Sequence, residues 1–210
     1  MMWPEFLGPA GRLEARLDEP AVTPDHIRAV VVFAHPHPQY GGTMHTKVVY
    51  QAAKALARIG CAVLRFNFRG VGASQGSYDN GVGESDDFRA ALDFMHARYP
   101  SKHIWTGGFS FGAWIALTVG TGDPRVSTLI GIAPPVATHN FGVVSASTKP
   151  KFFIQGERDE ICPLKQMQTF YARCEEPKEL VVIDAADHLF DGKTSEVGDA
   201  IEDLLSDWSG

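Results

Sequence analysis

A serine stands at a sharp corner between an apolar strand and an apolar helix. The corner is the segment GGFSFGA at residues 107–113, with apolar residues before it (103–106) and after it (114–119). A chain that turns from strand to helix within about two residues holds the corner residue in a strained conformation and brings the flanking backbones very close. Gly108 and Gly112, two residues on either side of Ser110, remove the Cβ atoms that would clash. Such five-residue patterns also occur by chance in ordinary turns, but the strand and helix here favour a hydroxyl projected from the tip of a sheet.

Segments typical of strands and of helices alternate along the chain. Continuous apolar runs predict covered strands, and the period-two pattern at residues 13–17 predicts an early, half-exposed antiparallel strand. We expect further strands near 29–34, 61–68, 127–133, 151–155 and 179–184, and helices near 48–59, 84–99, 164–174 and 195–208, with Ser85 as a cap. This alternation predicts an α/β fold, a mostly parallel sheet with helices on both faces.

Length, composition and net charge limit the classes of protein to which this chain can belong. A chain of 210 residues without repeats or a linker fits one domain, residues 1–210, and the longest irregular stretch, 134–150, is too short for a separate lid domain. The net charge of −6 without a basic block argues against nucleic-acid binding, and no apolar run has membrane-spanning length. Three cysteines without ligand-like spacing predict a reduced, cytoplasmic compartment.

A serine hydroxyl needs a base within hydrogen-bond reach, and that base needs a carboxylate to orient it. Functional groups of open parallel sheets gather where the strands end, so the base and the acid are expected directly after the later strands. Asp159 follows the strand at 151–155 and a turn glycine, and His188 follows the last strand. Asp184 and Asp187 are rival acids, although Asp187 adjoins His188 and its side chain is expected to point elsewhere. The order Ser110, Asp159, His188 predicts a nucleophile, its orienting acid and its general base.

An oxyanion formed at the serine needs two fixed donors. The N–H of Phe111, at the start of the helix, is one candidate. The second is expected in the loop that begins HPHPQYGG at residue 35, where the prolines have no N–H. We choose His37, two residues beyond the strand. Tyr40 and Phe141 are candidates to line the substrate pocket, while Arg65 and Arg69 are weaker candidates to meet an anionic substrate.

The order Ser110, Asp159, His188 along the chain resembles that of the α/β-hydrolase superfamily. Within the superfamily, the chain resembles the small, cap-poor bacterial serine hydrolases and esterases related to dienelactone hydrolase. Further matching segments are HPHP at residues 35–38 with GGTM at 41–44, FNFRGVGAS at 66–74 and ADHLF at 186–190. The resemblance implies an α/β-hydrolase fold with about seven to eight strands, little or no cap domain, no cofactor and no metal. Dienelactone hydrolases use a cysteine nucleophile, whereas Ser110 stands here, so the resemblance does not establish their particular lactone as the substrate.

The sequence therefore predicts a hydrolase that cleaves a small-molecule carboxylic ester, with a short acyl chain, through an acyl-enzyme. Lactone, thioester or peptide hydrolysis and acyl transfer use the same machinery and stay open. An alternative of another class is a metal-dependent hydrolase built on His35 and His37, but the chain is short for such a barrel and the serine corner would stay unexplained. A non-catalytic binding protein on this fold is the third alternative. Whether the chain forms a homo-oligomer is not decided by its sequence.

Overall fold

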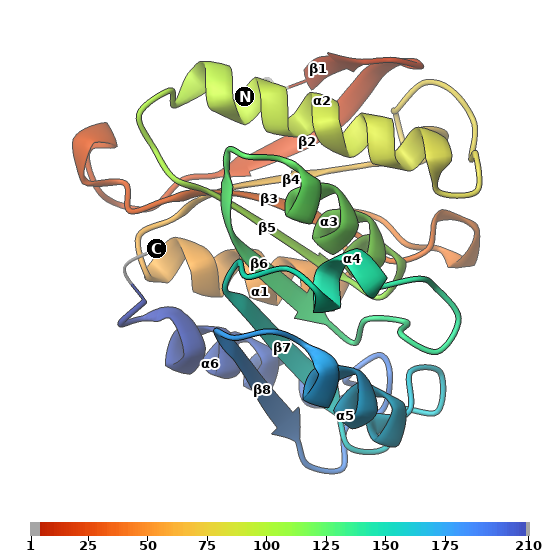
Figure 1. Ribbon diagram of the computed structural model, residues 1–210. Coiled ribbons are helices and arrows are strands. Elements are labelled where there is room, and N and C mark those ends of the chain that lie inside the picture. Colours follow the sequence, from red (N-terminus) through yellow and green to blue (C-terminus); the bar gives the residue numbers. More distant parts are fainter. Residues whose placement is uncertain (1–4, 209–210) are drawn as a thin grey trace.

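The centre of the protein is an eight-stranded sheet, shown in Figure 1. The computed structural model describes residues 5–208. Its strands are β1 (Glu5–Gly8), β2 (Gly11–Asp18), β3 (Val30–Ala34), β4 (Ala62–Phe66), β5 (Ile104–Phe109), β6 (Val126–Ile132), β7 (Lys151–Gly156) and β8 (Lys178–Ile183). Their spatial order is β1-β2-β4-β3-β5-β6-β7-β8; β2 is antiparallel to β1 and β4, and all other pairs are parallel. The predicted mostly parallel α/β fold is confirmed.

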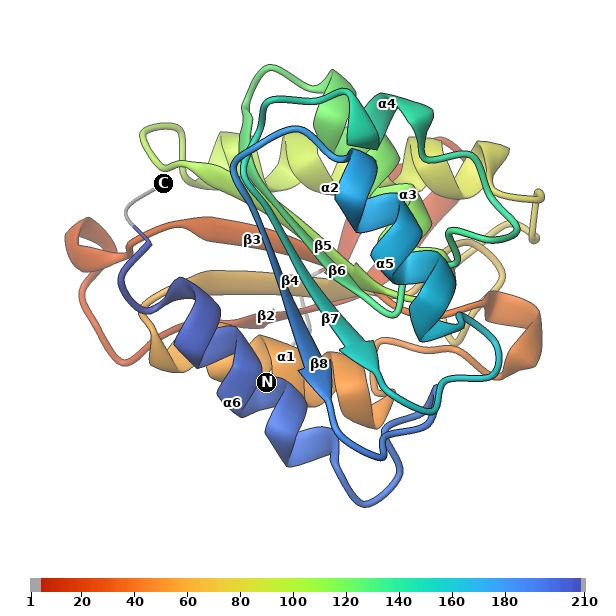
Figure 2. The same cartoon turned by 60° about the horizontal axis from the view of Figure 1, so that its bottom comes forward.

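Helices cover both faces of the sheet. They are α1 (Lys47–Arg58), α2 (Val82–Arg98), α3 (Phe111–Gly122), α4 (Gly142–Ser145), α5 (Leu164–Arg173) and α6 (Thr194–Leu205). In Figure 2, α1 and α6 lie below the sheet, and α2, α3, α4 and α5 lie above it. Val30 packs into the core on the α2 and α3 side, whereas Val31 packs into the core on the α1 and α6 side. A strand covered on both faces needs apolar side chains at successive positions, which explains the unbroken apolar run of β3.

Several local details differ from the sequence predictions. Strand β1 was not predicted; it is a short edge strand that pairs with β2 through a tight hairpin. Ser85 is not the cap of α2, because the helix begins at Val82, after Gly81. The carboxylate of Glu84 instead accepts the N–H of Gly81 at 2.7 Å, and the Ser85 hydroxyl donates to the Gly81 carbonyl. The irregular stretch 134–150 contains the single-turn helix α4.

The parallel arrangement brings the carboxyl ends of β3 to β8 to one edge of the sheet. The loops after β3, β5, β7 and β8 carry His37, Ser110, Asp159 and His188, so these four residues reach the same edge. Among residues 5–208, no helix has the length and apolar character required to cross a membrane.

Candidate active site

Ser110 occupies the predicted corner between β5 and α3. Its backbone has φ 54° and ψ −120°, a strained conformation for a residue with a side chain. A Cβ on Gly108 would collide with the backbone of Gly112, and a Cβ on Gly112 would collide with the carbonyl oxygens of Ala34 and His35. Both glycines are therefore required by close backbone approach, one within the corner and one where the corner meets the end of β3.

Three side chains distant in the sequence form one hydrogen-bonded series. His188 Nε2 lies 3.0 Å from Ser110 Oγ, and His188 Nδ1 lies 2.8 Å from Asp159 Oδ2. A carboxylate only accepts hydrogen bonds, so Nδ1 carries the proton and Nε2 accepts from the serine hydroxyl. The rival Asp187 instead accepts the N–H of Asp191 at 3.0 Å. The structure thus brings together the three residues selected from the order of strands along the chain.

The carboxylate of Asp159 is buried and fixed from several directions. Oδ1 accepts the N–H groups of Ile161 and Cys162 at 2.9 and 2.7 Å, while Oδ2 accepts from the side-chain amide of Gln155 at 3.0 Å. Gln155 also donates to the carbonyl of Cys162, so it links both sides of this turn. Gln155 was not predicted as a site residue. Its signal was a polar residue at the end of an otherwise apolar, buried strand.

The two residues predicted to donate to an oxyanion lie beside each other. Phe111 is the first residue of α3, so its N–H has no acceptor within the helix. His37 lies on the loop after β3, and its ring centroid is 4.9 Å from that of Phe111. Both residues line the cavity that contains Ser110.

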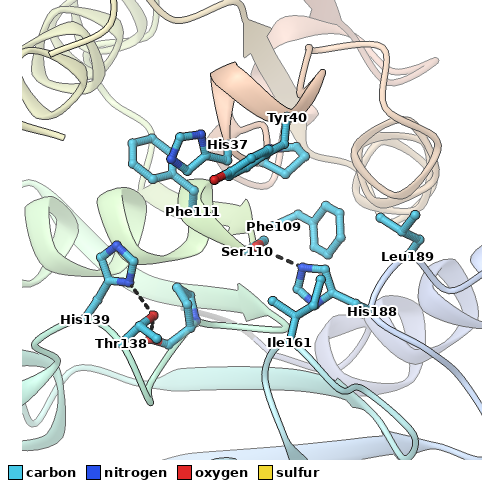
Figure 3. Close-up of a pocket in the computed structure, with 12 residues that line it drawn as sticks. His37, Tyr40, Phe109, Ser110, Phe111, Thr138, His139, Ile161, His188 and Leu189 are labelled. Atoms are coloured by element: carbon cyan, nitrogen blue, oxygen red, sulfur yellow. Dashed lines mark hydrogen bonds between the residues drawn. The ribbon is translucent and has the colours of Figure 1, made fainter. Parts of the chain in front are cut away.

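The cavity above Ser110 has a volume of about 530 Å³. Figure 3 shows it between the aromatic rings of His37, Tyr40 and Phe111 on one side and Ile161, His188 and Leu189 on the other. No Asp, Glu, Lys or Arg occurs among its lining residues, which are Pro36, His37, Tyr40, Phe109, Ser110, Phe111, Pro135, Thr138, His139, Ile161, His188 and Leu189. Apolar side chains are exposed at the rim: Tyr40 (86%), Ile161 (64%) and Leu189 (57%). The site is open and largely apolar.

Placement of the other expected residues is mixed. Tyr40 lines the cavity as predicted, whereas Phe141 does not: it is buried in the core, with its ring 5.5 Å from that of Phe170. Arg65 and Arg69 are paired with Asp18 and Asp87 at 2.6 and 2.7 Å, and neither lines the cavity. Thr138, His139 and Ile161 were not predicted as lining residues because each lies on a loop without a motif, and Leu189 was not predicted although it follows His188 in the segment at 186–190.

The imidazoles of His35 and His37 are already engaged. His35 is fully buried; its Nδ1 lies 2.6 Å from the carbonyl of Pro36, and its Nε2 accepts the N–H of Phe68 at 3.1 Å. Burial lowers the pKa of His35 to about 4. His37 Nδ1 accepts the N–H of Gln39, and its Nε2 lies 3.1 Å from the Tyr78 hydroxyl. The arrangement therefore does not fit the alternative of a metal bound by this pair.

A second group of residues has ligand-type atoms close together. Atoms of Asp159, Cys162 and His188 lie within 4.8 Å of one another. Asp159 and His188 are bonded to each other, however, and burial raises the pKa of the Cys162 thiol to about 12, which keeps it protonated. Because metals bind the thiolate, this set fits a proton relay better than a metal centre.

Comparison with known proteins places this chain in a family. The family model described as serine aminopeptidase, S33, matches residues 25–147. An alpha-beta serine hydrolase homologue from Coxiella burnetii is 40% identical, with a TM-score of 0.91 and 98% of each chain covered. A serine hydrolase without lid from Xanthomonas campestris is 34% identical, with a TM-score of 0.91 over 99% of this chain and 94% of the other. The esterase domain of a Rhodothermus marinus protein is 25% identical, with a TM-score of 0.77 over 100% and 99%.

The predicted superfamily and the absence of a large cap agree with these relatives, whereas the narrower kinship with dienelactone hydrolases stays a prediction. The matched family model covers the serine corner and the loop with His37 but ends before Asp159 and His188. The remaining candidate residues, Asp159 and His188, are placed by their hydrogen-bond distances in the structure. The chain belongs to the α/β-hydrolase superfamily, in the serine hydrolase family that this model describes.

Proposed function

We propose that this protein hydrolyses carboxylic esters through an acyl-enzyme formed on Ser110. The observation that carries the proposal is the series from Asp159 through His188 to Ser110, with donor–acceptor distances of 2.8 and 3.0 Å. In this proposal His188 takes the hydroxyl proton as Ser110 attacks the ester carbonyl. Asp159 keeps the proton on Nδ1 and stabilises the imidazolium that forms.

The oxyanion of the tetrahedral intermediate would accept the N–H groups of Phe111 and His37. His188 then gives its proton to the leaving alcohol, whose departure leaves Ser110 acylated. A water molecule, deprotonated by His188, attacks the acyl carbonyl and releases the acid by the same route. Ser110 recovers its proton at the end, so the cycle consumes one water and one ester.

The lining of the cavity supports a neutral, apolar substrate. A substrate with a free ammonium group, as an aminopeptidase requires, would need a carboxylate to bind it, and no Asp or Glu is among the residues that line the cavity. An anionic acyl group would equally lack a cation, because Arg65 and Arg69 are paired elsewhere. The resemblance to an esterase domain supports the same substrate class. The small open cavity favours short acyl chains.

Two p-nitrophenyl esters of nearly equal size test this proposal: the valerate, which is neutral, and the hemiglutarate, which ends in a carboxylate. We expect kcat/KM for the valerate to exceed that for the hemiglutarate at least about tenfold, since a buried charge without a partner is unfavourable. Ser110→Ala should lose activity on both and should not react with a fluorophosphonate. Ser110→Ala with wild-type activity would overturn the mechanism, and preference for the hemiglutarate would overturn the substrate class.

Acyl length and bond type are tested in the same assay. Activity on p-nitrophenyl esters from acetate to palmitate should be highest for short chains, and a maximum at palmitate would contradict an open, short site. Thioesters, lactones and amides of the preferred acyl group, compared at equal concentration, measure whether the ester is the preferred bond.

A further inference from the structure

We propose that Tyr78 is a positioning residue that fixes the second oxyanion donor, by holding the side chain of His37 against Phe111. The inference rests on the proposed function, because the N–H groups of Phe111 and His37 are the donors assigned there. It concerns the side chains of His37 and Tyr78, which have no part in the proton relay.

The loop that carries His37 is bonded mainly to itself. The carbonyl of His37 accepts the N–H groups of Tyr40 and Gly42, both at 3.1 Å, and its Nδ1 accepts the N–H of Gln39 at 3.2 Å. Among residues 5–208, one hydrogen bond joins residues 37–42 to a separate segment, and it runs between His37 Nε2 and the Tyr78 hydroxyl at 3.1 Å. The position of this compact loop therefore depends on one polar contact and on ring packing.

The direction of the hydrogen bond between His37 Nε2 and the Tyr78 hydroxyl can be assigned. Since Nδ1 of neutral His37 accepts from Gln39, Nε2 carries the proton and donates to the Tyr78 oxygen. Burial lowers the pKa of His37, which favours the neutral ring. The contact thus requires an oxygen at the end of the Tyr78 ring, which phenylalanine lacks.

Three rings from three segments pack together at this point. The His37 ring lies 4.9 Å from Phe111 at the start of α3 and 5.1 Å from Tyr78 in the loop before α2, and Tyr78 lies 6.1 Å from Phe111. Figure 3 shows His37 and Phe111 side by side along one wall of the cavity. The two residues assigned as donors are therefore joined through their side chains, and Tyr78 contacts both.

Fixed donors stabilise a transition state because they need no rearrangement when the charge develops. A loop that is free to shift would still admit the substrate, since its binding relies on the apolar cavity. It would, however, hold the oxyanion less well. Loss of the Tyr78 hydroxyl should therefore lower kcat and leave KM nearly unchanged.

The test compares Tyr78→Phe and His37→Ala with wild type and with the control Tyr171→Phe. Tyr171 donates one hydrogen bond to the carbonyl of Lys178, does not line the cavity, and should keep full activity when changed. Removal of a whole oxyanion donor lowers kcat about 10²- to 10³-fold, so we expect about tenfold for Tyr78→Phe and up to about 10²-fold for His37→Ala, which keeps the N–H. Affinity for a trifluoromethyl ketone, whose adduct with serine bears an oxyanion, should fall in parallel, while Tm stays close to that of wild type.

His37→Pro separates positioning from donation. The φ of −52° and ψ of 123° at His37 suit a proline that precedes Pro38, so this variant removes the N–H in a compatible backbone. We expect it to be slower than His37→Ala. If Tyr78→Phe keeps kcat and ketone affinity within twofold of wild type while His37→Pro is impaired, the role of Tyr78 is overturned and the donor assignment stands. Wild-type activity in Ser110→Ala would instead refute the proposed function itself.

Discussion

Acid should destabilise this protein through His35, the buried residue next to the active-site loop. Its Nε2 accepts the N–H of Phe68, so a proton on that nitrogen would face another donor inside the core. Burial lowers its pKa from 6.5 to about 4. Between these two values the unfolded chain binds a proton and the folded chain does not, so the free energy of unfolding falls as the pH falls.

The size of this effect follows from the two pKa values. The whole difference between 6.5 and about 4 corresponds to about 3 kcal/mol, of which about 2 kcal/mol is lost between pH 8 and pH 5. Below the folded pKa both states are protonated, so His35 has no further effect. Because carboxylates and other histidines also titrate in this range, wild type must be compared with a variant that lacks only this imidazole.

His35→Gln is that variant, because its amide oxygen can accept the Phe68 N–H and its nitrogen can donate to Pro36. Urea unfolding of both proteins at pH 8, 6.5 and 5 gives the free energy of unfolding at each pH. His35→Gln is expected to be less stable than wild type at pH 8, but the difference should shrink by about 2 kcal/mol at pH 5. A difference that stays constant from pH 8 to pH 5 would refute the reasoning.

Three other changes test the site and its surroundings. Asp159→Asn should lower kcat about 10⁴-fold with little change in Tm, as measured by ester hydrolysis and thermal unfolding, because the amide no longer keeps the proton on His188 Nδ1; a drop below tenfold would make Asp159 dispensable. Gly112→Ala should lower both kcat and Tm, since its methyl group would meet two backbone carbonyls that cannot move independently; full activity would show that the corner has room. A thiol reagent at pH 8 should react only after denaturation, and rapid reaction of the native protein would contradict the burial that raises the thiol pKa values of Cys61, Cys162 and Cys174.

The sequence predicted best those features that the backbone enforces locally. At the Ser110 corner, two glycines mark positions where a Cβ would strike backbone atoms, so the fold leaves a direct trace in residue type. Asp159 and His188 could be placed because Asp159 follows the buried strand β7, His188 follows the edge strand β8, and parallel strands end at a common edge. Their mutual contact is therefore a consequence of topology, which the alternation of strands and helices already indicates.

Contacts between distant side chains that the strand order does not determine could not be predicted. Arg65 and Arg69 look available for an anion until Asp18 and Asp87 are placed beside them, and neither pairing has a local signal. Phe141 illustrates the same limit, because an aromatic ring near a cavity can turn toward it or into the core. Here α4 and α5 cover it, and its ring packs against Phe170.

The same distinction separates the proposed reacting groups from the proposed substrate-binding surface. Ser110 is set by the corner at β5, and its partners by turns at the ends of β7 and β8, where Asp159 is held by the two N–H groups after it. Ile161 and Leu189 lie on those same turns, but their side chains are exposed at the rim of the cavity. In the proposed ester hydrolysis, substitution at these rim positions is therefore expected to alter which acyl or alcohol group fits without disturbing the hydrogen bonds of Asp159, His188 and Ser110. Relatives with this fold are expected to share the mechanism more closely than the substrate, because the backbone that fixes the chemistry leaves the rim free to vary.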